Sequence, residues 1–508
     1  MDKTISLLEK MALLCLMLAT TLPVRGAWFD NDWQFRKPVT INSAPVAANL
    51  TDFPLLVVIT DPQLNQARAD GFDLVFTAAD GSTRLEHEIE RFQAGSGELI
   101  AWVRIPLLSA TNDSTIWLYY GNPASANQQN AVSVWSNGYR MIQHLNENAG
   151  AGNFLLDSTS NNNHGAPLGN TPTFVEARID GGYDVSGNNQ QRIEIPDSAS
   201  LRVNGQLTAE GWALVRSNQP AANPPLNSAA PVNPIIWKGV RIGWGTQYLF
   251  RIAVRDPTQM TWGISCGGLE AWFSAGTPQF DQWAHYALTF DGAVIRAFIN
   301  GVEVGSRNSC NGVNLNVMDG LPVRAGFGFR QFNDQQTHLD GILDELRISA
   351  TARSSNWLQT QVNNHSNPQS FISVGEEETG EPLILVSRTV NPASSDPNSI
   401  VEHTLQFEGS QGLARSITIE ESLGRFNRFV DDAFGPGVHF QLEDDAVMPA
   451  GVTLGDQRFS TDGINFQPIP GPPGWADDLT HWQVDIIGDM PIGSRFTLRY
   501  QSRISDIP

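Results

Sequence analysis

The sequence predicts an all-β protein made of successive β-sandwiches. Its 45 glycines and 30 prolines divide the chain into short segments. Between them lie short runs rich in valine, isoleucine, phenylalanine and tyrosine, which is the pattern of strands. No heptad repeat or long amphipathic helix interrupts these runs, and a length of 508 residues is typical of about three domains.

Residues 1–26 have the features of a secretory signal peptide. Lys3 and Lys10 precede an apolar run at 11–22, and Pro23 ends that run. The run is too short to remain as a membrane anchor. We therefore expect a secreted or cell-surface protein with no membrane insertion after signal cleavage.

The net charge of −21 limits the partners of the chain. Nucleic acid and anionic membrane surfaces repel a protein of this charge, so neither is expected as a ligand. We interpret the charge as a means of solubility outside the cell, with affinity for cations as the alternative.

The first domain, at 27–122, is predicted to be a β-sandwich. Trp33, Phe35, Val39 and Ile41 alternate as in a half-buried strand, and several further short strands follow. Its motifs W-x-F-R-x-P-V-x-I, L-x-H-E-I-E, A-W-V-R-I-P and W-L-Y-Y-G-N resemble a bacterial domain of unknown function, DUF2341. This domain commonly precedes a laminin G-like module, and the resemblance implies no function.

One dense polar cluster lies in this first domain, at Glu86, His87, Glu88 and Glu90. Strand alternation places the three glutamates on one face and His87 on the other. Three carboxylates could bind a hard cation or act as acid and base. We favour the alternative, a solvated strand face with a partner such as Arg91 or Arg104.

A second domain is predicted at 135–376, and its closing segment is the most informative part. Residues 337–349 have the pattern of a strand, with Ile342, Leu346 and Ile348 on one face and Asp344 among them. Glu345 and Arg347 are expected on the opposite face. Ser354 is a candidate N-cap for a short helix that Asn367-Pro368 ends, and 371–374 returns as a strand.

The segment G-x-x-D-E-x-R-I, followed by the helix with its tryptophan, resembles the end of laminin G-like, concanavalin A-like lectin domains. The opening of the domain, with the turn at 157–165, resembles the start of the same family. The hairpin at 283–304, with turns at Asp291-Gly292 and Asn300-Gly301, fits its core. The resemblance implies a two-sheet antiparallel jelly roll.

Modules of this family often hold a structural calcium ion. By position, the resemblance implies Asp157, Asn161, Asn163 and Asp344 as its ligands, and oxygen ligands from a turn suit Ca²⁺. The alternative is a turn satisfied by its own backbone, with Asp344 paired to Arg347 or Arg353.

Carbohydrate binding would need exposed aromatic platforms. The candidates are Trp244, Tyr248, Trp262 and Trp272, with Phe273 beside the last, although each could instead be a packing residue. Glucanases of this fold carry an E-x-D-x-x-E strand whose carboxylates act as nucleophile and acid. The sequence has no such motif, so we predict a protein that is not an enzyme.

Two cysteines remain after signal cleavage, Cys266 and Cys310. In an oxidising compartment such a pair usually forms a disulfide, and two free buried thiols are the alternative.

The third domain, at 382–508, is predicted to be an Ig-like sandwich from its short hydrophobic runs. Residues 460–463 are read as a turn. The leading hypothesis is an exported, adhesin-like binding protein whose laminin G-like module takes a glycan or a surface protein. The alternatives are a secreted polysaccharide-active enzyme with accessory modules and a structural spacer of the cell envelope.

Overall fold

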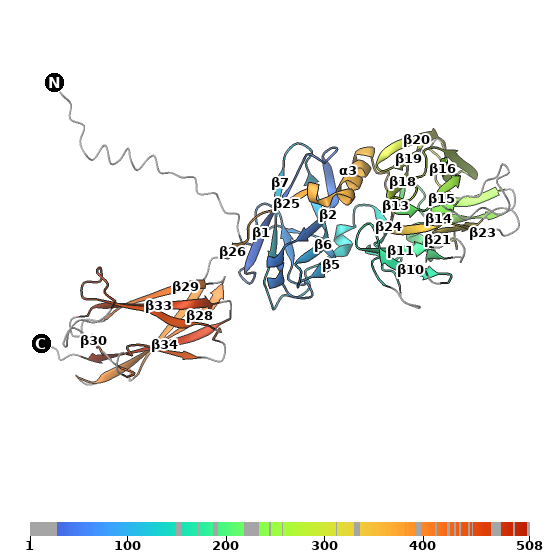
Figure 1. Cartoon of the computed structure of the whole chain (residues 1–508). Coiled ribbons are helices and arrows are strands. Elements are labelled where there is room, and N and C mark those ends of the chain that lie inside the picture. Colours follow the sequence, from blue (N-terminus) through green and yellow to red (C-terminus); the bar gives the residue numbers. More distant parts are fainter. Residues whose placement is uncertain are drawn as a thin grey trace, which may run out of the picture. The chain divides into compact units, whose positions relative to one another are not determined.

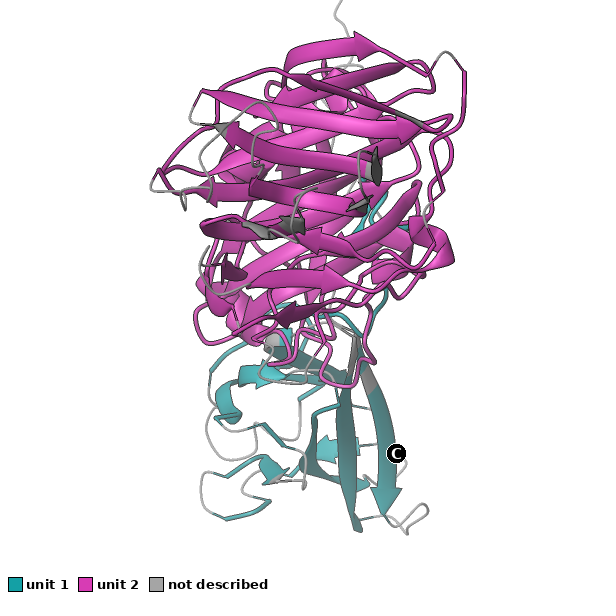
Figure 2. Cartoon of the chain, turned by 90° about the vertical axis from the view of Figure 1, so that its right-hand side faces the viewer, with its two compact units in different colours: residues 1–34, 77–84, 379–508 teal, residues 35–76, 85–378 magenta. Residues whose placement is uncertain are grey.

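The chain divides into two compact units in the computed structural model (Figure 2). The larger unit comprises 35–76 and 85–378, and the smaller unit comprises 1–34, 77–84 and 379–508. No helix of the described chain is both long and apolar enough to span a bilayer. The structure describes residues 28–148, 154–170, 172–185, 191–217, 233–242, 245–256, 258–310, 312–317, 319–329, 336–380, 383–391, 398–411, 414–423, 427–430, 433–435, 438–444, 448–449, 451–468, 479–490 and 493–504.

The larger unit begins with the predicted sandwich (Figure 1). One sheet has the order β25-β1-β7-β3-β4, with β26 paired to β1, and the other has the order β2-β6-β5. The strands are β1 (Phe35–Ile41), β2 (Leu50–Thr60), β3 (Val75–Thr77), β4 (Arg84–Leu85), β5 (His87–Gln93), β6 (Glu98–Leu108), β7 (Ser114–Tyr120), β25 (Ile372–Val374) and β26 (Glu378–Thr379).

The last strand of this sandwich comes from far along the chain. β25 pairs with β1 in antiparallel register, with Ile372 opposite Ile41. The helix before it, α3 (Ser355–Ser366), begins at the predicted N-cap, Ser354. The Asn364 side chain bonds both the backbone N–H (2.8 Å) and the carbonyl (3.0 Å) of Leu56 on β2. The chain therefore leaves the first sandwich, forms the jelly roll and returns to complete the first sandwich.

The central part is an antiparallel jelly roll, as predicted. Its first sheet has the order β10-β11-β24-β13-β18-β19-β20 with β8 beside β24, and its second has the order β17-β16-β15-β14-β21-β12-β9. The first contains β8 (Tyr139–Gln143), β10 (Thr173–Glu176), β11 (Gly181–Val185), β13 (Leu207–Val215), β18 (Ala284–Phe290), β19 (Val294–Ile299), β20 (Val302–Asn308) and β24 (Gly341–Ser349). The second contains β9 (Ala166–Leu168), β12 (Arg192–Ile195), β14 (Asn233–Ile242), β15 (Gly245–Asp256), β16 (Gln259–Cys266), β17 (Leu269–Ser274) and β21 (Val323–Ala325).

One apolar core fills the space between these two sheets. Phe250, Trp262, Tyr286 and Phe290 are each fully buried in it. Burying a side chain of this size contributes roughly 1.5–3 kcal/mol. The predicted disulfide joins Cys266 and Cys310, whose Cα atoms are 5.7 Å apart.

A β-bulge on β24 corrects one detail of the prediction. Arg347 pairs with Glu210 but Asp344 pairs with Trp212, so β24 has one extra residue between them. The bulge lies at Glu345, whose backbone has a positive φ of 52°. Because an extra residue reverses strand alternation, Leu343 rather than Asp344 joins Leu346 in the core.

The smaller unit contains the predicted C-terminal sandwich. One sheet has the order β27-β28-β34-β30, with β31 also on β34, and the other has the order β29-β33-β32. Its core gathers Phe440, Phe459, Trp482 and Tyr500. Its strands are β27 (Leu383–Asn391), β28 (Ile400–Gln411), β29 (Ala414–Ser422), β30 (Asn427–Phe429), β31 (Gln441–Asp444), β32 (Thr453–Ser460), β33 (His481–Met490) and β34 (Arg495–Ile504).

Candidate functional site

The outer face of the seven-stranded sheet brings chemically unusual side chains together. On β16, Met260, Trp262 and Ile264 enter the core, so the residues between them face outward. Strand pairing then sets one row across this face: Trp272 on β17, Gly263 on β16, Arg251 on β15 and Trp237 on β14. We call Trp237, Arg251, Thr261, Ser265 and Trp272 the outer-face residues.

Trp272 is an exposed aromatic residue among the described residues of this face. It is 40% exposed, and it is the one tryptophan among the exposed large apolar side chains of the described chain. The guanidinium carbons of Arg251 and Arg255 each lie 5.9 Å from its ring centroid, within the range of a cation–π contact. Its cross-strand neighbour is glycine, so no side chain from that position covers the indole.

Three polar groups of the outer face are buried and have no hydrogen-bond partner. They are the hydroxyls of Thr261 and Ser265, each 1% exposed, and the indole N–H of Trp237, 4% exposed. Nine in ten or more buried polar groups in proteins have a partner, so three orphans on one face require an explanation. Because these groups are enclosed, a ligand rich in hydroxyl groups could supply those hydrogen bonds only after the side chains that cover them move aside.

Two of the other predicted aromatic residues, Trp262 and Phe273, do not contribute to this face. Trp262 is fully buried, and its indole N–H donates to the Ala275 carbonyl at 2.8 Å. Because its ring is enclosed in the core, the prediction of Trp262 as a ligand platform is wrong. Phe273 packs against the same core. Trp244 and the side chain of Tyr248 lie outside the described residues.

The predicted calcium loop satisfies its own polar groups. One carboxylate oxygen of Asp157 accepts from the N–H groups of Ile142 (2.9 Å) and Thr159 (3.0 Å). The other accepts from the Thr159 hydroxyl (2.8 Å) and the N–H of Asn163 (2.7 Å). The loop therefore already uses the oxygens that a cation would need.

The remaining predicted calcium ligands also have partners in the protein. The Asn163 carbonyl oxygen accepts from Ser198 at 2.6 Å, and the Asn161 amide donates to the Arg140 carbonyl at 3.2 Å. Asp344 is buried and accepts from the N–H of Ile179 at 2.8 Å. Asp157 and Asn163 thus already use their oxygens inside the protein, whereas one oxygen of Asp344 has no partner, and calcium binding stays a prediction.

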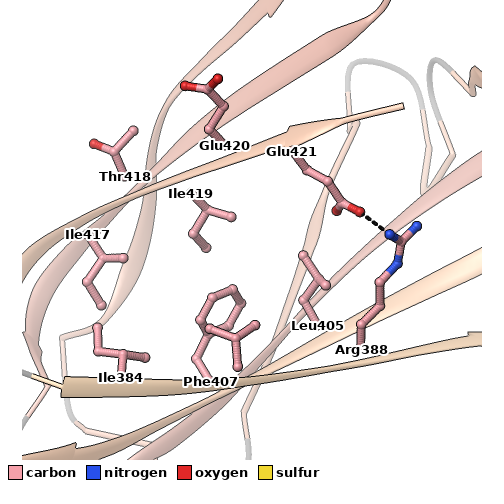
Figure 3. A pocket seen from close by; sticks show the side chains of 10 residues that line it. Ile384, Arg388, Leu405, Phe407, Ile417, Thr418, Ile419, Glu420 and Glu421 are labelled. Atoms are coloured by element: carbon pink, nitrogen blue, oxygen red, sulfur yellow. Dashed lines mark ion pairs between the residues drawn. The ribbon is translucent and has the colours of Figure 1, made fainter. Parts of the chain in front are cut away.

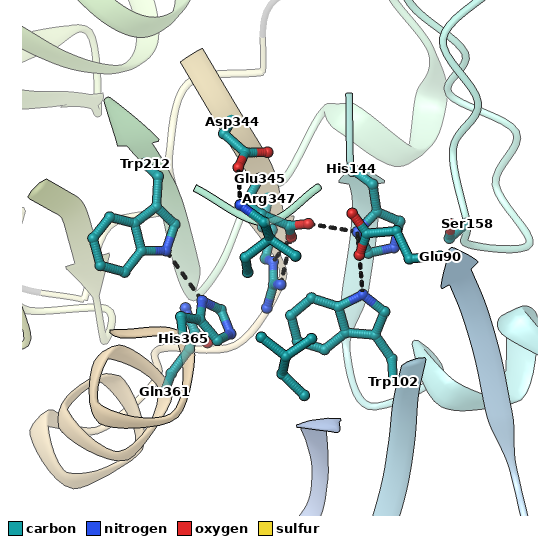
Figure 4. A network of polar contacts seen from close by, with 12 residues as sticks. Glu90, Trp102, His144, Ser158, Trp212, Asp344, Glu345, Arg347, Gln361 and His365 are labelled. Atoms are coloured by element: carbon teal, nitrogen blue, oxygen red, sulfur yellow. Dashed lines mark hydrogen bonds and ion pairs between the residues drawn. The ribbon is translucent and has the colours of Figure 1, made fainter. Parts of the chain in front are cut away.

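A second concentration of charge lies buried where the first sandwich meets the jelly roll (Figure 4). His144, which follows β8, is held on both ring nitrogens. Its Nδ1 lies 2.7 Å from Glu345 on β24, and its Nε2 lies 3.3 Å from Glu88 on β5. Arg347 binds the other oxygen of Glu345. We call Glu88, Glu90, His144, Glu345 and Arg347 the buried network.

Aromatic side chains enclose this network. The indole N–H of Trp102 donates to Glu90 at 2.7 Å, and that of Trp135 donates to Glu88 at 2.5 Å. The Arg347 guanidinium carbon lies 4.6 Å from the Trp102 ring centroid. The side chain of Glu90 is fully buried and that of Glu88 is 14% exposed, so the interpretation of this strand face as solvated is wrong. His87 faces the other way and contacts Phe76, as alternation predicts.

Burial and neighbouring charges raise the pKa of some groups in the network and lower that of others. Burial alone would lower the pKa of His144, but Glu345, Glu88 and Glu90 outweigh it and hold the pKa well above 6.5. Burial raises the pKa of Glu345, yet His144 and Arg347 bring it below its ordinary value. Burial, with Glu345 nearby, holds the pKa of Glu90 well above 4.5. The network thus contains a protonated imidazole between carboxylates.

Glu90, His144 and Glu345 also have ligand-type atoms within 4.8 Å of one another. The 2.7 Å contact between His144 and Glu345 is a hydrogen-bond distance, so these two groups bind each other directly. The sequence showed each half of this network, in L-x-H-E-I-E and in D-E-x-R. It gave no sign that the two halves meet.

Two family models match separate parts of the chain. Residues 186–359 match the concanavalin A-like lectin/glucanases superfamily. Residues 70–151 match the domain of unknown function DUF2341. Both matches confirm the resemblances stated from the sequence, and the jelly roll is a lectin-like fold. A search of curated proteins found no match.

Solved structures give only distant likenesses. The binding domain of paraclostridial mosquitocidal protein 1 is 13% identical with a TM-score of 0.35, over 45% of this chain and 52% of that one. The chain thus spans about half of that protein's length. Domain 4 of an extracellular arabinanase from Geobacillus stearothermophilus, solved with arabinotriose, is 19% identical with a TM-score of 0.30. The match covers 44% of this chain and 98% of that one. The botulinum neurotoxin serotype G binding domain is 11% identical with a TM-score of 0.34. The match covers 55% of this chain and 77% of that one. Likenesses this distant support no argument about function.

Proposed function

We propose that the protein is an exported, adhesin-like binding protein that holds a glycan on the outer face of its seven-stranded sheet. The observation that supports this most is the combination of an exposed Trp272 with buried, unpaired hydroxyl and indole groups beside it. Sugars have apolar faces and many hydroxyl groups. An indole ring can cover the apolar face of a sugar, and polar groups without a partner can bond its hydroxyl groups.

Binding without cleavage is the form of this proposal that the sequence favours, because the carboxylate motif of the related glucanases is absent. On the same sheet Glu194 is bound by two arginines, Arg192 at 2.9 Å and Arg324 at 2.8 Å. Export is proposed from the signal-like residues 1–26, and the Cys266–Cys310 disulfide is consistent with an oxidising compartment. A surface protein as the ligand is the second candidate, and a glycan is favoured because hydroxyl groups match the orphaned atoms.

The test is a glycan array probed with the full chain, followed by titration calorimetry on the best ligand. Trp272→Ala should weaken binding at least about tenfold, which corresponds to about 1.4 kcal/mol. Phe154→Ala is the matched control, because Phe154 is exposed (66%) but belongs to neither sheet of the jelly roll. No binding to any glycan, or equal loss in both variants, would refute the proposal. Release of reducing ends from the bound polysaccharide would favour the enzyme alternative.

A further inference from the structure

Two cavities of the described chain have opposite linings. A cavity of about 440 Å³ in the C-terminal sandwich is lined mainly by apolar side chains such as Ile384, Leu405 and Phe407 (Figure 3). A cavity of about 390 Å³ in the jelly roll is lined mainly by polar residues. Its volume lies at the lower end of the range for small-molecule sites, roughly 300–1,000 Å³. We call this second cavity the polar pocket.

The polar pocket lies between β8, the end of β24 and the segment 199–206 that leads into β13. The Asn163 side chain bonds two of these walls together. Its amide donates to the Arg140 carbonyl at 2.6 Å and to the Ser200 hydroxyl at 2.9 Å. The turn that was predicted to hold calcium therefore holds the walls of this pocket in place.

The polar pocket carries a positive charge that no carboxylate balances. Asp197 binds both Arg202 at 2.7 Å and Lys238 at 2.6 Å. Asp319 also binds Arg202, at 3.2 Å, so the two cations and two anions of this group balance one another. Arg140 is exposed, and no ion pair joins it to a carboxylate of the described residues. The lining itself contains no acidic residue, although the chain has a net charge of −21.

Uncharged donors lie beside this charge. Within the described chain, the backbone N–H groups of 203–206 donate to no other group, and the exposed side-chain amides of Asn204 and Gln206 have no hydrogen bond. A Cβ atom on Gly205 would meet nothing within 4 Å, so the space beside this residue is open. Guanidinium and backbone N–H groups bind carboxylate and phosphate oxygens, and amides bond hydroxyl groups. The pocket thus offers partners for both kinds of group.

We propose that the polar pocket binds a small, hydroxyl-rich molecule with one anionic group, of the class of sugar acids and sugar phosphates. The anionic group accepts from Arg140 and from the N–H groups of 203–206. The amides of Asn204 and Gln206 bond the hydroxyl groups. The inference does not depend on glycan binding at the outer face, because Trp272 lies on β17 of the other sheet of the jelly roll.

The test is titration calorimetry of the full chain with glucuronate, glucose 6-phosphate, glucose and inorganic phosphate, at low salt so that charges are weakly screened. We expect saturable binding of at least one of the two charged sugars, and the tighter of them identifies the anionic group. Glucose lacks the charge and inorganic phosphate lacks the sugar hydroxyls, so each should bind at least about tenfold more weakly. No binding of either charged sugar would overturn the proposal, and so would equally tight binding of glucose or of inorganic phosphate.

Gly205→Asp and Gly205→Asn form a matched pair, because the position is open and the two side chains have nearly the same size. The added carboxylate should repel the anionic group and weaken binding at least about tenfold relative to Gly205→Asn. Arg140→Gln should weaken it by a similar factor. Gly95→Asp adds the same charge at another open, exposed position of the larger unit and should leave binding unchanged.

Equal affinity of the two Gly205 variants would contradict the proposal, as would an equal loss in Gly95→Asp. Trp272→Ala separates this site from the outer face. Unchanged binding of the charged sugar in that variant supports the polar pocket. Loss of binding would place the ligand beside Trp272 and overturn the assignment.

Discussion

The buried network and the outer-face residues are both concentrations of polar groups in the larger unit, yet they are built in opposite ways. In the network, His144 and Arg347 are buried together with carboxylates that bind them. On the outer face, Thr261, Ser265 and Trp237 are buried with no partner at all. Burial is similar in the two places, but the charged groups of the network bind one another, although Glu90 Oε1 and Arg347 Nη1 are also left without a partner.

This difference separates a structural role from a binding role. A buried charge that finds its partners inside the protein holds elements together, here β5 of the first sandwich and β24 of the jelly roll. A buried polar group without a partner costs about 1–3 kcal/mol, and that cost is recovered only if something else supplies the hydrogen bond. Substitutions in the network should therefore change stability, and substitutions on the outer face should change binding.

The largest effect is expected from Arg347→Ala. Removal of one partner of a buried ion pair typically costs about 3–5 kcal/mol, because the remaining charge is left uncompensated. Urea unfolding followed by hydrogen exchange in β24 would measure the loss in the larger unit. Arg296→Ala is the control: its pair with Asp291 at 2.6 Å is about one-third exposed and should contribute no more than about 1 kcal/mol. A similar cost for both would show that the network does not differ from a surface pair.

A smaller but sharper contrast is expected between two glutamates of the network. Glu345→Gln removes a carboxylate that both His144 and Arg347 bind, and it should cost about 3 kcal/mol. Glu90→Gln should cost less than about 0.5 kcal/mol, because a carboxyl whose pKa is held well above 4.5 is already neutral near that value. The same unfolding experiment at mildly acidic pH compares them. Equal costs would mean that Glu90 is ionised in the folded chain.

The network should also make the larger unit less stable in alkaline solution. His144 has a pKa above 6.5 in the folded chain. Its contribution to the free energy of unfolding is therefore fully present below pH 6.5 and is lost as the pH rises through the raised pKa. Glu90 and Asp344 also have raised pKa values and act in the same direction. Protection from hydrogen exchange in β5 and β24 should fall as the pH rises above about 6.5. His144→Gln should flatten this dependence, and an unchanged slope would contradict it.

Much of the fold could be predicted from the sequence, because alternation, turn residues and the Ser354 N-cap are local signals. The helix before β25 followed in the same way, and the disulfide followed from an isolated pair of cysteines in a chain expected to be exported. The predictions that failed depended on contacts between distant parts of the chain or on a local irregularity of a strand. One extra residue at Glu345 reversed the face of Asp344, and a strand that begins at Ile372 returned to pair with β1 in the first sandwich. Periodicity cannot show that Glu88 on one domain meets His144 on the next.

An effect on stability of the opposite sign is expected from Thr261→Val. Valine matches the shape of threonine and removes a buried hydroxyl that has no partner, so the larger unit should become more stable by about 1 kcal/mol. If a glycan bonds this hydroxyl, the same change should weaken binding. Calorimetry with the ligand from the array and urea unfolding without it measure the two effects on one variant. Gain of stability with loss of affinity is the result that the outer-face assignment requires, since a hydroxyl bonded inside the protein would give a loss of stability instead.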